Sequence, residues 1–369
     1  MEKQRDTLID LLKGIGITSI VIGHSSWILP GCNFPIGPFV YTYHLMIFFF
    51  VAGMSFKPRN DITPYMQIGK RLGGVLPIYV KYSIVFILLH NFFLKIHILK
   101  SDTIVYGKLD IIKLIFEACI FGTSEAMLSA FWFVSMFFIG VSMFMLLYYH
   151  AEKMKYPIIW HILCGVLTAI VGIWLNDNEV ILQYHIQTSV LGITVIYLGY
   201  LFQHYRQYMM KYLQWWLSPI LGIVIWKILS LNIGMVELSA NMILHPLIFY
   251  PITILGITFC ICIAQGFDKV GVLRTLFCTA GKNSYHIMAL HIITFKCFDL
   301  MICKIWKLGN ETLECFPYSF EKLWPIYYIV GVAVPLILVY GERWLIERTR
   351  IAINKKFLKY KLYPLSRTF

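Results

Sequence analysis

A histidine within a stretch otherwise suited to lipid is the first residue able to do chemistry. The run IVIGHSSW, residues 20–27, contains His24 followed by two serines. Burying an ionisable side chain at membrane depth is unfavourable, and such a residue usually faces a bundle interior or a watery cavity. His24 is therefore the first candidate functional residue.

Two further polar residues share a helix face with His24. At about 100° per residue, Asp10, Lys13 and His24 fall on one stripe within roughly 60°. Asp10 and Lys13 can pair on adjacent turns at the inner end, whereas His24 lies about 16 Å further along the helix. This stripe predicts a polar track that leads deep into the bilayer.

The next predicted span carries a second histidine, His44. Because this span runs in the opposite direction, His44 and His24 are predicted at similar depth and could meet. A metal ion would need three or four ligands, and no His-x3-His pair or carboxylate cluster supplies the others. We therefore predict no metal site. A hydrogen bond to a neighbouring backbone remains the ordinary alternative for each histidine.

Lys70 and Arg71 stand side by side where the third predicted span begins, with Gly73, Gly74 and Pro77 following. Paired basic residues at such a position are ordinary anchors on the cytoplasmic face. They can equally hold phosphate, because arginine donates bidentate hydrogen bonds and glycines let a ligand approach the backbone. The sequence leaves both interpretations open.

Three lysines, Lys81, Lys227 and Lys296, fall in the middle of predicted spans. Few acidic residues are available to pair with them, and Asp10 and Asp299 are the clearest candidates. An excess of buried positive charge indicates a hydrated cavity that receives an anion. The alternative is that some of these lysines are neutral or lie nearer to the helix ends than predicted.

The composition identifies the class of protein. Of the 369 residues, 59% are hydrophobic and only 14% are charged, which is too apolar for a soluble core under a polar surface. About ten apolar stretches are long enough to cross a bilayer. They are 9–29, 39–56, 73–94, 130–149, 157–175, 188–203, 213–231, 242–264, 283–301 and 324–346. The shorter stretch 111–122 is predicted to be interfacial or re-entrant. We expect an all-α, polytopic integral membrane protein.

The distribution of positive charge predicts the orientation. Lysine and arginine collect in short cytoplasmic loops, and the loops 30–38, 176–187 and 232–241 contain neither. Ten spans with both termini in the cytoplasm satisfy this rule. We predict one transmembrane domain over 1–346 and a basic cytoplasmic tail over 347–369 on the anionic inner leaflet. The net charge of +13 then requires no nucleic-acid partner.

The first span lacks the short apolar region and small-residue cleavage site of a removable signal, so we expect an uncleaved anchor. Nine cysteines lie mostly within spans, where they are ordinary apolar thiols. Cys32, Cys303 and Cys315 are predicted on the outer side, where a disulfide could form, but nothing selects a pair.

Five motifs, in chain order, resemble those of membrane acyltransferase family 3. In the first, RDTLIDLLKGIGITSIVIGH, an arginine, an aspartate, a basic residue and a deep histidine recur at the family's spacing, here Arg5, Asp10, Lys13 and His24. The remaining four are YTYHLMIFFFVAG with His44, GKRLGGVLPIY with Lys70 and Arg71, FWFVSMFF with Trp132, and GKNSYHIMALH with Tyr285 and His291. The Gly-Gly after the basic pair departs from the larger residues usual there.

The resemblance covers nearly the whole chain and implies a fold with a core of ten helices. It also implies transfer of an acyl group, most often acetyl, from cytoplasmic acetyl-CoA to a hydroxyl of a cell-surface or lipid-linked sugar or polysaccharide. Acetyl-CoA is then a donor substrate, and no cofactor is bound permanently. Succinyl and longer acyl groups remain open, and the expected location is a bacterial plasma membrane.

The resemblance also suggests roles for residues. His24 and His44 are the candidate catalytic histidines, with His24 as a general base or as the site of a transient acyl-imidazole. Asp10 is grouped with them, as a structural partner of Arg5 or Lys13 or as a proton relay. The donor's phosphates are assigned to four basic residues: Arg5, Lys13, Lys70 and Arg71. The acceptor is assigned to Ser25, Trp27, Trp132, Tyr285 and His291, although serine hydroxyls more often bond back to helix carbonyls.

A transporter of an anionic or sugar-linked substrate is the main alternative function, because cations at an inner mouth also suit a carrier. The chain shows no internal repeat and no pair of matched broken helices in its two halves, which are typical of secondary transporters. A non-catalytic sensor or scaffold is a third possibility. We therefore predict a membrane-embedded O-acetyltransferase.

Overall fold

The fold is a bundle of helices, seen in a computed structural model that describes residues 6–361 apart from 30, 32–33, 60, 123–124, 232–233 and 244. Side chains are described as far as Ile351. The α-helices are α1 (Thr7–Ser25), α2 (Ile36–Tyr41), α3 (Met46–Ser55), α4 (Pro64–Lys95), α5 (Lys108–Ala118), α6 (Trp132–Ala151), α7 (Pro157–Asp177), α8 (Ile186–Met209), α9 (Ser218–Leu229), α10 (Pro246–Lys269), α11 (Gly271–Lys282), α12 (Ser284–Trp306) and α13 (Trp324–Lys361). Short 3₁₀ turns are η1 (Ala126–Phe131), η2 (Gln183–His185), η3 (Trp215–Leu217), η4 (Leu238–Ala240), η5 (Asn310–Glu314) and η6 (Glu321–Leu323).

Among the residues described, nine helical segments are long and apolar enough to cross a membrane, and each matches a predicted span. The tenth predicted span, 213–231, forms only the shorter apolar helix Trp215–Leu229. At 1.5 Å per residue this helix is about 22 Å long, less than the roughly 30 Å of a hydrocarbon core. It starts late because Gln214 has an extended backbone. The all-α, polytopic prediction is confirmed, whereas the orientation of the termini stays a prediction.

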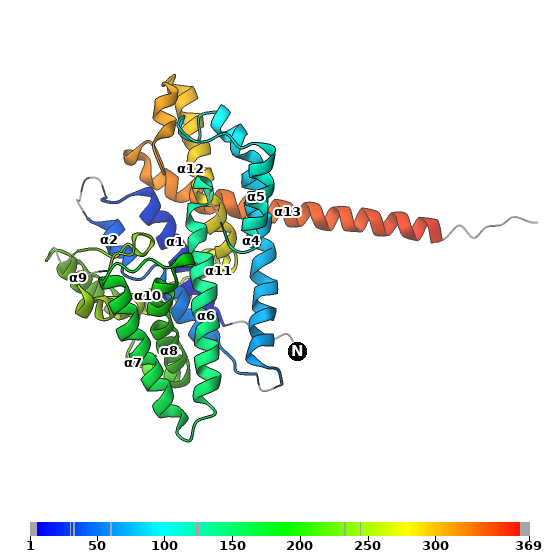
Figure 1. Cartoon of the computed structure of the whole chain (residues 1–369). Helices are drawn as coiled ribbons and strands as arrows, with labels where there is room; N and C mark the ends of the chain where they lie inside the picture. The colour runs from blue at the N-terminus through cyan, green and yellow to red at the C-terminus, as the bar shows by residue number, and fades with distance from the viewer. Residues whose placement is uncertain are drawn as a thin grey trace, which may run out of the picture.

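Helix α1 lies at the centre of the bundle, in contact with α2, α3, α10, α11, α12 and α13 (Figure 1). Most of its residues are buried, including Asp10, which is 2% exposed, and the others are partly buried. Helix α7 lies at the periphery, where exposed apolar side chains such as Ile162, Val166 and Ile170 suit contact with lipid. The polar residues of α1 are therefore enclosed by protein.

Close helix crossings at glycines hold α1 in place. A Cβ built on Gly14 would collide with the carbonyl oxygen of Phe277 in α11, and one on Gly281 would collide with that of Asp10 in α1. The same reciprocal arrangement joins α3 and α8 through Gly53 and Gly199. Small residues allow such close packing of membrane helices. Three of these glycines lie within the motifs of the resemblance.

The second predicted span is interrupted where the sequence indicates one continuous helix. Helix α2 ends at Tyr41, α3 begins at Met46, and His44 lies in the turn between them. The hydroxyl of Thr42 donates to the carbonyl oxygen of Phe39 at 2.8 Å, which offers the backbone a local alternative to the helix. Irregular backbone at membrane depth is tolerated where protein or a cavity surrounds it.

The prediction that three mid-span lysines mark an anion cavity was wrong. Lys296 is 1% exposed, and its Nζ donates to Asp299 at 3.3 Å, to the carbonyl oxygen of Cys315 at 2.7 Å and to that of Leu313. Asp299 also accepts hydrogen bonds from Ser319. This cluster fastens the segment after α12 to the helix. The prediction failed because the partners of Lys296 include backbone carbonyl groups of this folded-back segment, which sequence spacing does not reveal.

The other two lysines lie at the surface of the bundle. Lys81 forms an ion pair with Glu342 and is about half exposed. Nζ of Lys227 lies 5.2 Å from the ring centroid of Trp226, which is also exposed. Neither side chain points to an enclosed anion site.

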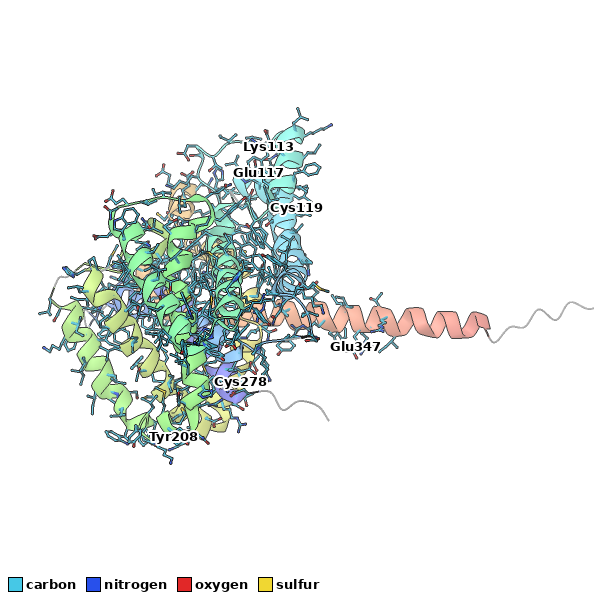
Figure 2. The ribbon with its side chains drawn as sticks, turned by 60° about the horizontal axis from the view of Figure 1, so that its bottom comes forward. Lys113, Glu117, Cys119, Tyr208, Cys278 and Glu347 are labelled. Atoms are coloured by element: carbon cyan, nitrogen blue, oxygen red, sulfur yellow. The ribbon has the colours of Figure 1, made fainter. Side chains whose placement is uncertain are left out.

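Two further elements lie at the surface of the bundle. The stretch predicted to be interfacial forms the short helix α5, on which Lys113 and Glu117 lie close together, with 3.8 Å between Nζ and Oε1 (Figure 2). Glu347 lies on the part of α13 that extends away from the bundle (Figures 1 and 2). Cys303 and Cys315 are free thiols, and Cys32 lies outside the described residues.

Candidate functional site

One cavity, which we call the histidine cavity, is lined by both histidines of the first two spans. It has a volume of about 350 Å³. His24 comes from the last turn of α1 and His44 from the turn between α2 and α3. The polar and aromatic side chains on its other walls are Tyr41, Ser129, Trp132, Phe133, Glu237, Ser239 and Phe316. The cavity therefore combines two imidazoles, hydroxyls, aromatic rings and one carboxylate.

The hydrogen-bond partner of His24 is a third histidine, His291 of α12. Nδ1 of His24 lies 2.8 Å from Nε2 of His291, and the rings are nearly parallel with centroids 5.1 Å apart. His291 is fully buried. These two residues are 267 positions apart in the sequence, so only the fold brings them together.

The surroundings of His291 determine which nitrogens carry protons. Its Nδ1 lies 3.1 Å from the carbonyl oxygen of Ile287 and 2.9 Å from that of Met288. Carbonyl oxygens only accept, so Nδ1 of His291 must donate and its Nε2 must accept when the ring is neutral. Nδ1 of His24 then donates to that Nε2. Consequently Nε2 of His24 keeps a lone pair and can act as a base.

His44 lies beside this pair without replacing it. Its side chain is 4% exposed, and its ring meets the ring of Tyr41 edge-on with centroids 4.3 Å apart. His24 and His44, which were predicted to lie at similar depth, line the same cavity. The direct bond of His24 goes to His291.

A second cavity, which we call the basic cavity, is lined by two of the predicted phosphate-binding residues, Lys13 and Arg71. Its volume is about 260 Å³. Its other walls include Phe48, Val51, Ala52, Val75 and Phe137, together with the polar Ser55, Ser284 and Tyr285. None of the described residues that line it is acidic. The basic cavity therefore presents net positive charge at one part of a mainly apolar wall.

One face of α1 connects the two cavities. Lys13 and Ile17 line the basic cavity, whereas Ile20 and His24 line the histidine cavity. The spacing i, i+4, i+7, i+11 keeps these four side chains on one side of a helix. Lys13 and His24 are about 16 Å apart along the axis. The predicted polar track of α1 thus runs past two successive cavities.

Three of the residues predicted to bind the acceptor, Ser25, Trp27 and Tyr285, do not line the histidine cavity. The Ser25 hydroxyl donates to the carbonyl oxygen of Ile22 at 3.0 Å, and Trp27 packs against Tyr41 with ring centroids 5.3 Å apart. Neither lines the histidine cavity. Tyr285 lines the basic cavity instead.

The other predicted residues divide between the cavities and the surface. Trp132 lines the histidine cavity and packs on His185 with ring centroids 4.7 Å apart. Lys70 is exposed and lines neither cavity, whereas its neighbour Arg71 lines the basic one. Arg5 lies outside the described residues.

The sequence analysis did not identify Glu237 and Ser239, which face the histidine cavity from the segment before α10. Glu237 accepts hydrogen bonds from the backbone and side chain of Ser239 at 3.2 and 2.5 Å. A weak signal was present, because Glu237 is the one acidic residue in the stretch 232–241. Only the fold shows that Glu237 lines the histidine cavity.

The described residues contain no group of three or more His, Cys, Asp or Glu placed to hold a metal ion. The groups available in the histidine cavity are a neutral imidazole held in one tautomer, a second imidazole and a nearby carboxylate. This set suits proton transfer at a hydroxyl group.

Comparison with known proteins supports one family. No curated protein and no solved structure shows significant similarity to this chain. The family model described as Acyltransferase domain matches residues 6–341, which include every helix that lines the two cavities. Because this match spans most of the sequence, the chain belongs to the acyltransferase 3 family.

Proposed function

We propose that this membrane acyltransferase is an O-acetyltransferase, which transfers acetyl from cytoplasmic acetyl-CoA to a hydroxyl of a cell-surface or lipid-linked sugar. The observation that carries the proposal is the face of α1 that joins the basic cavity at Lys13 to the histidine cavity at His24. One cavity suits an anionic donor, and the other holds a base. The proposed location is the plasma membrane of a bacterium.

The basic cavity is the proposed donor site. Lys13 and Arg71 would contact phosphate groups of the donor, since cations near apolar walls bind anions more strongly than in water. The apolar residues beyond them, including Val51 and Phe137, would line the path of the thin pantetheine arm. The thioester would then reach His24 from the side of the basic cavity.

The histidine cavity is the proposed site of reaction and of the acceptor. A sugar ring presents apolar faces and hydroxyl edges, which match the indole of Trp132 and the polar groups of Ser129 and Glu237. The acceptor hydroxyl would donate its proton to Nε2 of His24. His291 holds the His24 ring in the tautomer that leaves this nitrogen free.

In direct transfer, the hydroxyl oxygen forms a bond to the thioester carbonyl carbon, and the carbon–sulfur bond breaks. The proton taken by His24 passes to the leaving thiolate, so the products are an ester and free thiol. Transfer through an acyl-imidazole would use the same lone pair of His24 as a nucleophile. Rapid quenching in denaturant at neutral pH after mixing with radiolabelled acetyl-CoA separates the routes, because only the second leaves label on the protein and an acyl-imidazole would hydrolyse in acid.

The test is thiol release from acetyl-CoA by purified protein in lipid, with a membrane extract as acceptor. We expect His24→Ala to lower turnover by about 10²- to 10⁴-fold, and Arg71→Ala to raise the donor concentration required. Arg59→Ala, at an exposed arginine paired with Asp61, is the matched control and should behave as wild type. A folded wild type that neither binds nor consumes acetyl-CoA would overturn the acetyl assignment.

A further inference from the structure

Two side chains separate the histidine cavity from the basic cavity. Phe133 of α6 and Met288 of α12 are the described residues that line both. They are 6% and 7% exposed, so each is packed among protein atoms. The wall between the cavities is therefore made of two apolar side chains from different helices.

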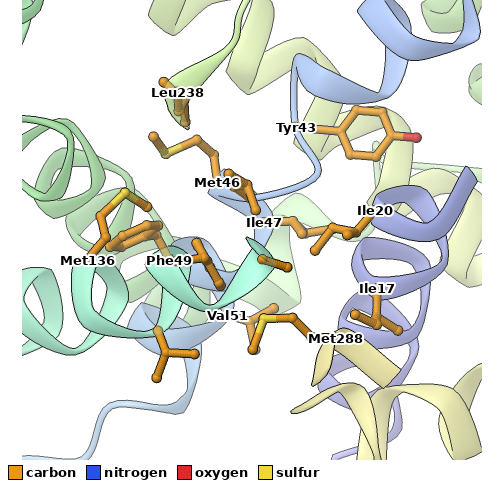
Figure 3. Packing of buried hydrophobic residues seen from close by; sticks show 14 of the residues in the cluster. Ile17, Ile20, Tyr43, Met46, Ile47, Phe49, Val51, Met136, Leu238 and Met288 are labelled. Atoms are coloured by element: carbon orange, nitrogen blue, oxygen red, sulfur yellow. The ribbon is translucent and has the colours of Figure 1, made fainter. Parts of the chain in front are cut away.

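The wall is thin. On α1, Ile17 lines the basic cavity and Ile20 lines the histidine cavity, and three residues correspond to about 4.5 Å of helix. Figure 3 shows the Met288 side chain extending from α12 beside Val51 and Ile17, which also line the basic cavity. A single layer of side chains thus closes the path along α1.

The chemistry of these two residues suits a wall that opens. Methionine is unbranched, with three rotatable bonds, and adapts to irregular spaces. Phe133 contacts other rings edge-on or stacked, including Phe137 with centroids 5.6 Å apart, and so belongs to an aromatic cluster. Neither residue offers a polar group, and neither hydrogen-bonds a ligand. Their contribution is to fill space.

We propose that Met288 and Phe133 form a gate through which the acyl thioester passes from the basic cavity to His24, and that these two side chains, which also line the histidine cavity, limit the length of the acyl group that fits beside His24. This inference rests on the proposed function, since the donor must enter through the basic cavity. A closed gate also separates two cavities that would otherwise join into one path through the bundle. Both side chains are apolar and occupy space on the wall of the histidine cavity, so they favour a short acyl group over a longer one.

The experiment compares acetyl-, butyryl- and hexanoyl-CoA as donors for wild type, Met288→Ala and Met288→Leu in lipid. Met288→Ala should raise the rate with butyryl-CoA relative to acetyl-CoA by about tenfold, the size of effect that one or two methylenes have in an apolar site. Met288→Leu conserves volume and should change the ratio little. Free CoA should still bind to both variants, because Lys13 and Arg71 are unchanged; this binding shows that a variant is folded.

Two further variants guard against a general effect on packing. Met136→Ala removes the side chain of a buried methionine on α6 that lines neither cavity, and it should leave the butyryl-to-acetyl ratio unchanged. Phe133→Leu shortens the other side chain of the gate, which leaves more space beside His24, and it should raise the ratio in the same direction as Met288→Ala. It decides the question if Met288→Ala does not fold.

The outcomes distinguish the gate from the function beneath it. If wild type turns over acetyl-CoA, while Met288→Ala and Phe133→Leu bind CoA and keep the wild-type ratio, the gate is wrong and the acetyltransferase proposal stands. An equal change in Met136→Ala also overturns the gate, because the effect is then not local. A wild type that consumes none of the three donors overturns both proposals.

Discussion

Helix α12 carries two buried polar clusters that differ in where their hydrogen bonds lead. Around Lys296, the donors are met by Asp299 and by the carbonyl oxygens of Leu313 and Cys315. His291 lies five residues earlier on the same helix, and its Nε2 bonds to His24, a residue on a cavity wall. Lys296, Asp299 and His291 are all nearly inaccessible to solvent.

The difference shows that burial alone does not identify a functional polar residue. Buried polar groups are nearly always hydrogen-bonded, whether they support structure or chemistry. The Lys296 cluster ends on backbone groups, so it closes a loop and leaves nothing for a ligand. The His291 cluster ends on His24, which lines the histidine cavity and so can meet a ligand there. The predictions below test this contrast.

The largest expected effect is on stability, from Lys296→Met. Removing this ammonium leaves the Asp299 carboxylate buried without its charged partner, which typically lowers the free energy of unfolding by about 3–5 kcal/mol. Thermal unfolding in lipid or detergent measures the loss. The double variant Lys296→Met, Asp299→Asn should recover part of it, because the uncompensated charge is gone. Equal stability of wild type and Lys296→Met would contradict the structural role of the Lys296 cluster.

The next effect is on turnover, from His291→Ala. Without the hydrogen-bond acceptor that His291 provides to Nδ1 of His24, the His24 ring is no longer held in one tautomer and orientation. We therefore expect kcat to fall about 10- to 100-fold, with an unchanged KM for the donor. His291→Gln keeps an oxygen acceptor and should restore part of kcat. A purely structural role would instead lower the unfolding temperature of both variants and leave the kcat of the folded fraction unchanged.

A smaller effect is expected at Arg71, a cation that lines a cavity rather than closing a loop. Arg71→Gln should raise the half-saturating acetyl-CoA concentration by about tenfold, through loss of a charge-assisted contact. Arg71→Lys keeps the charge without the planar fork, so its increase should be smaller. Neither variant should match the destabilisation of Lys296→Met, and an equal fall in unfolding temperature would contradict the assignment.

The smallest effect is expected at Ser25, the neighbour of His24. Its hydroxyl bonds to the carbonyl oxygen of Ile22 within α1 and does not face the histidine cavity. Ser25→Ala should change stability by less than about 1 kcal/mol and turnover by less than about twofold. A large loss of turnover in this variant would mean that the serine turns toward the substrate.

Much of the fold could be predicted from local pattern. A run of apolar residues about twenty long can satisfy its backbone in lipid only as a helix, so the spans follow from composition. The predicted span 213–231 was less accurate, because its helix begins only after Gln214. The break at His44 was missed because residues 39–52 contain no proline or glycine.

Of the candidate site, the sequence by itself determined the stripe from Asp10 through Lys13 to His24, because helical periodicity is a local property. It also carried the motifs that indicated the family. Only the tertiary structure decided that His24 bonds to His291, that Lys296 is satisfied, and that Phe133 and Met288 separate two cavities. These facts depend on contacts between helices distant in sequence, which packing selects and local spacing does not encode.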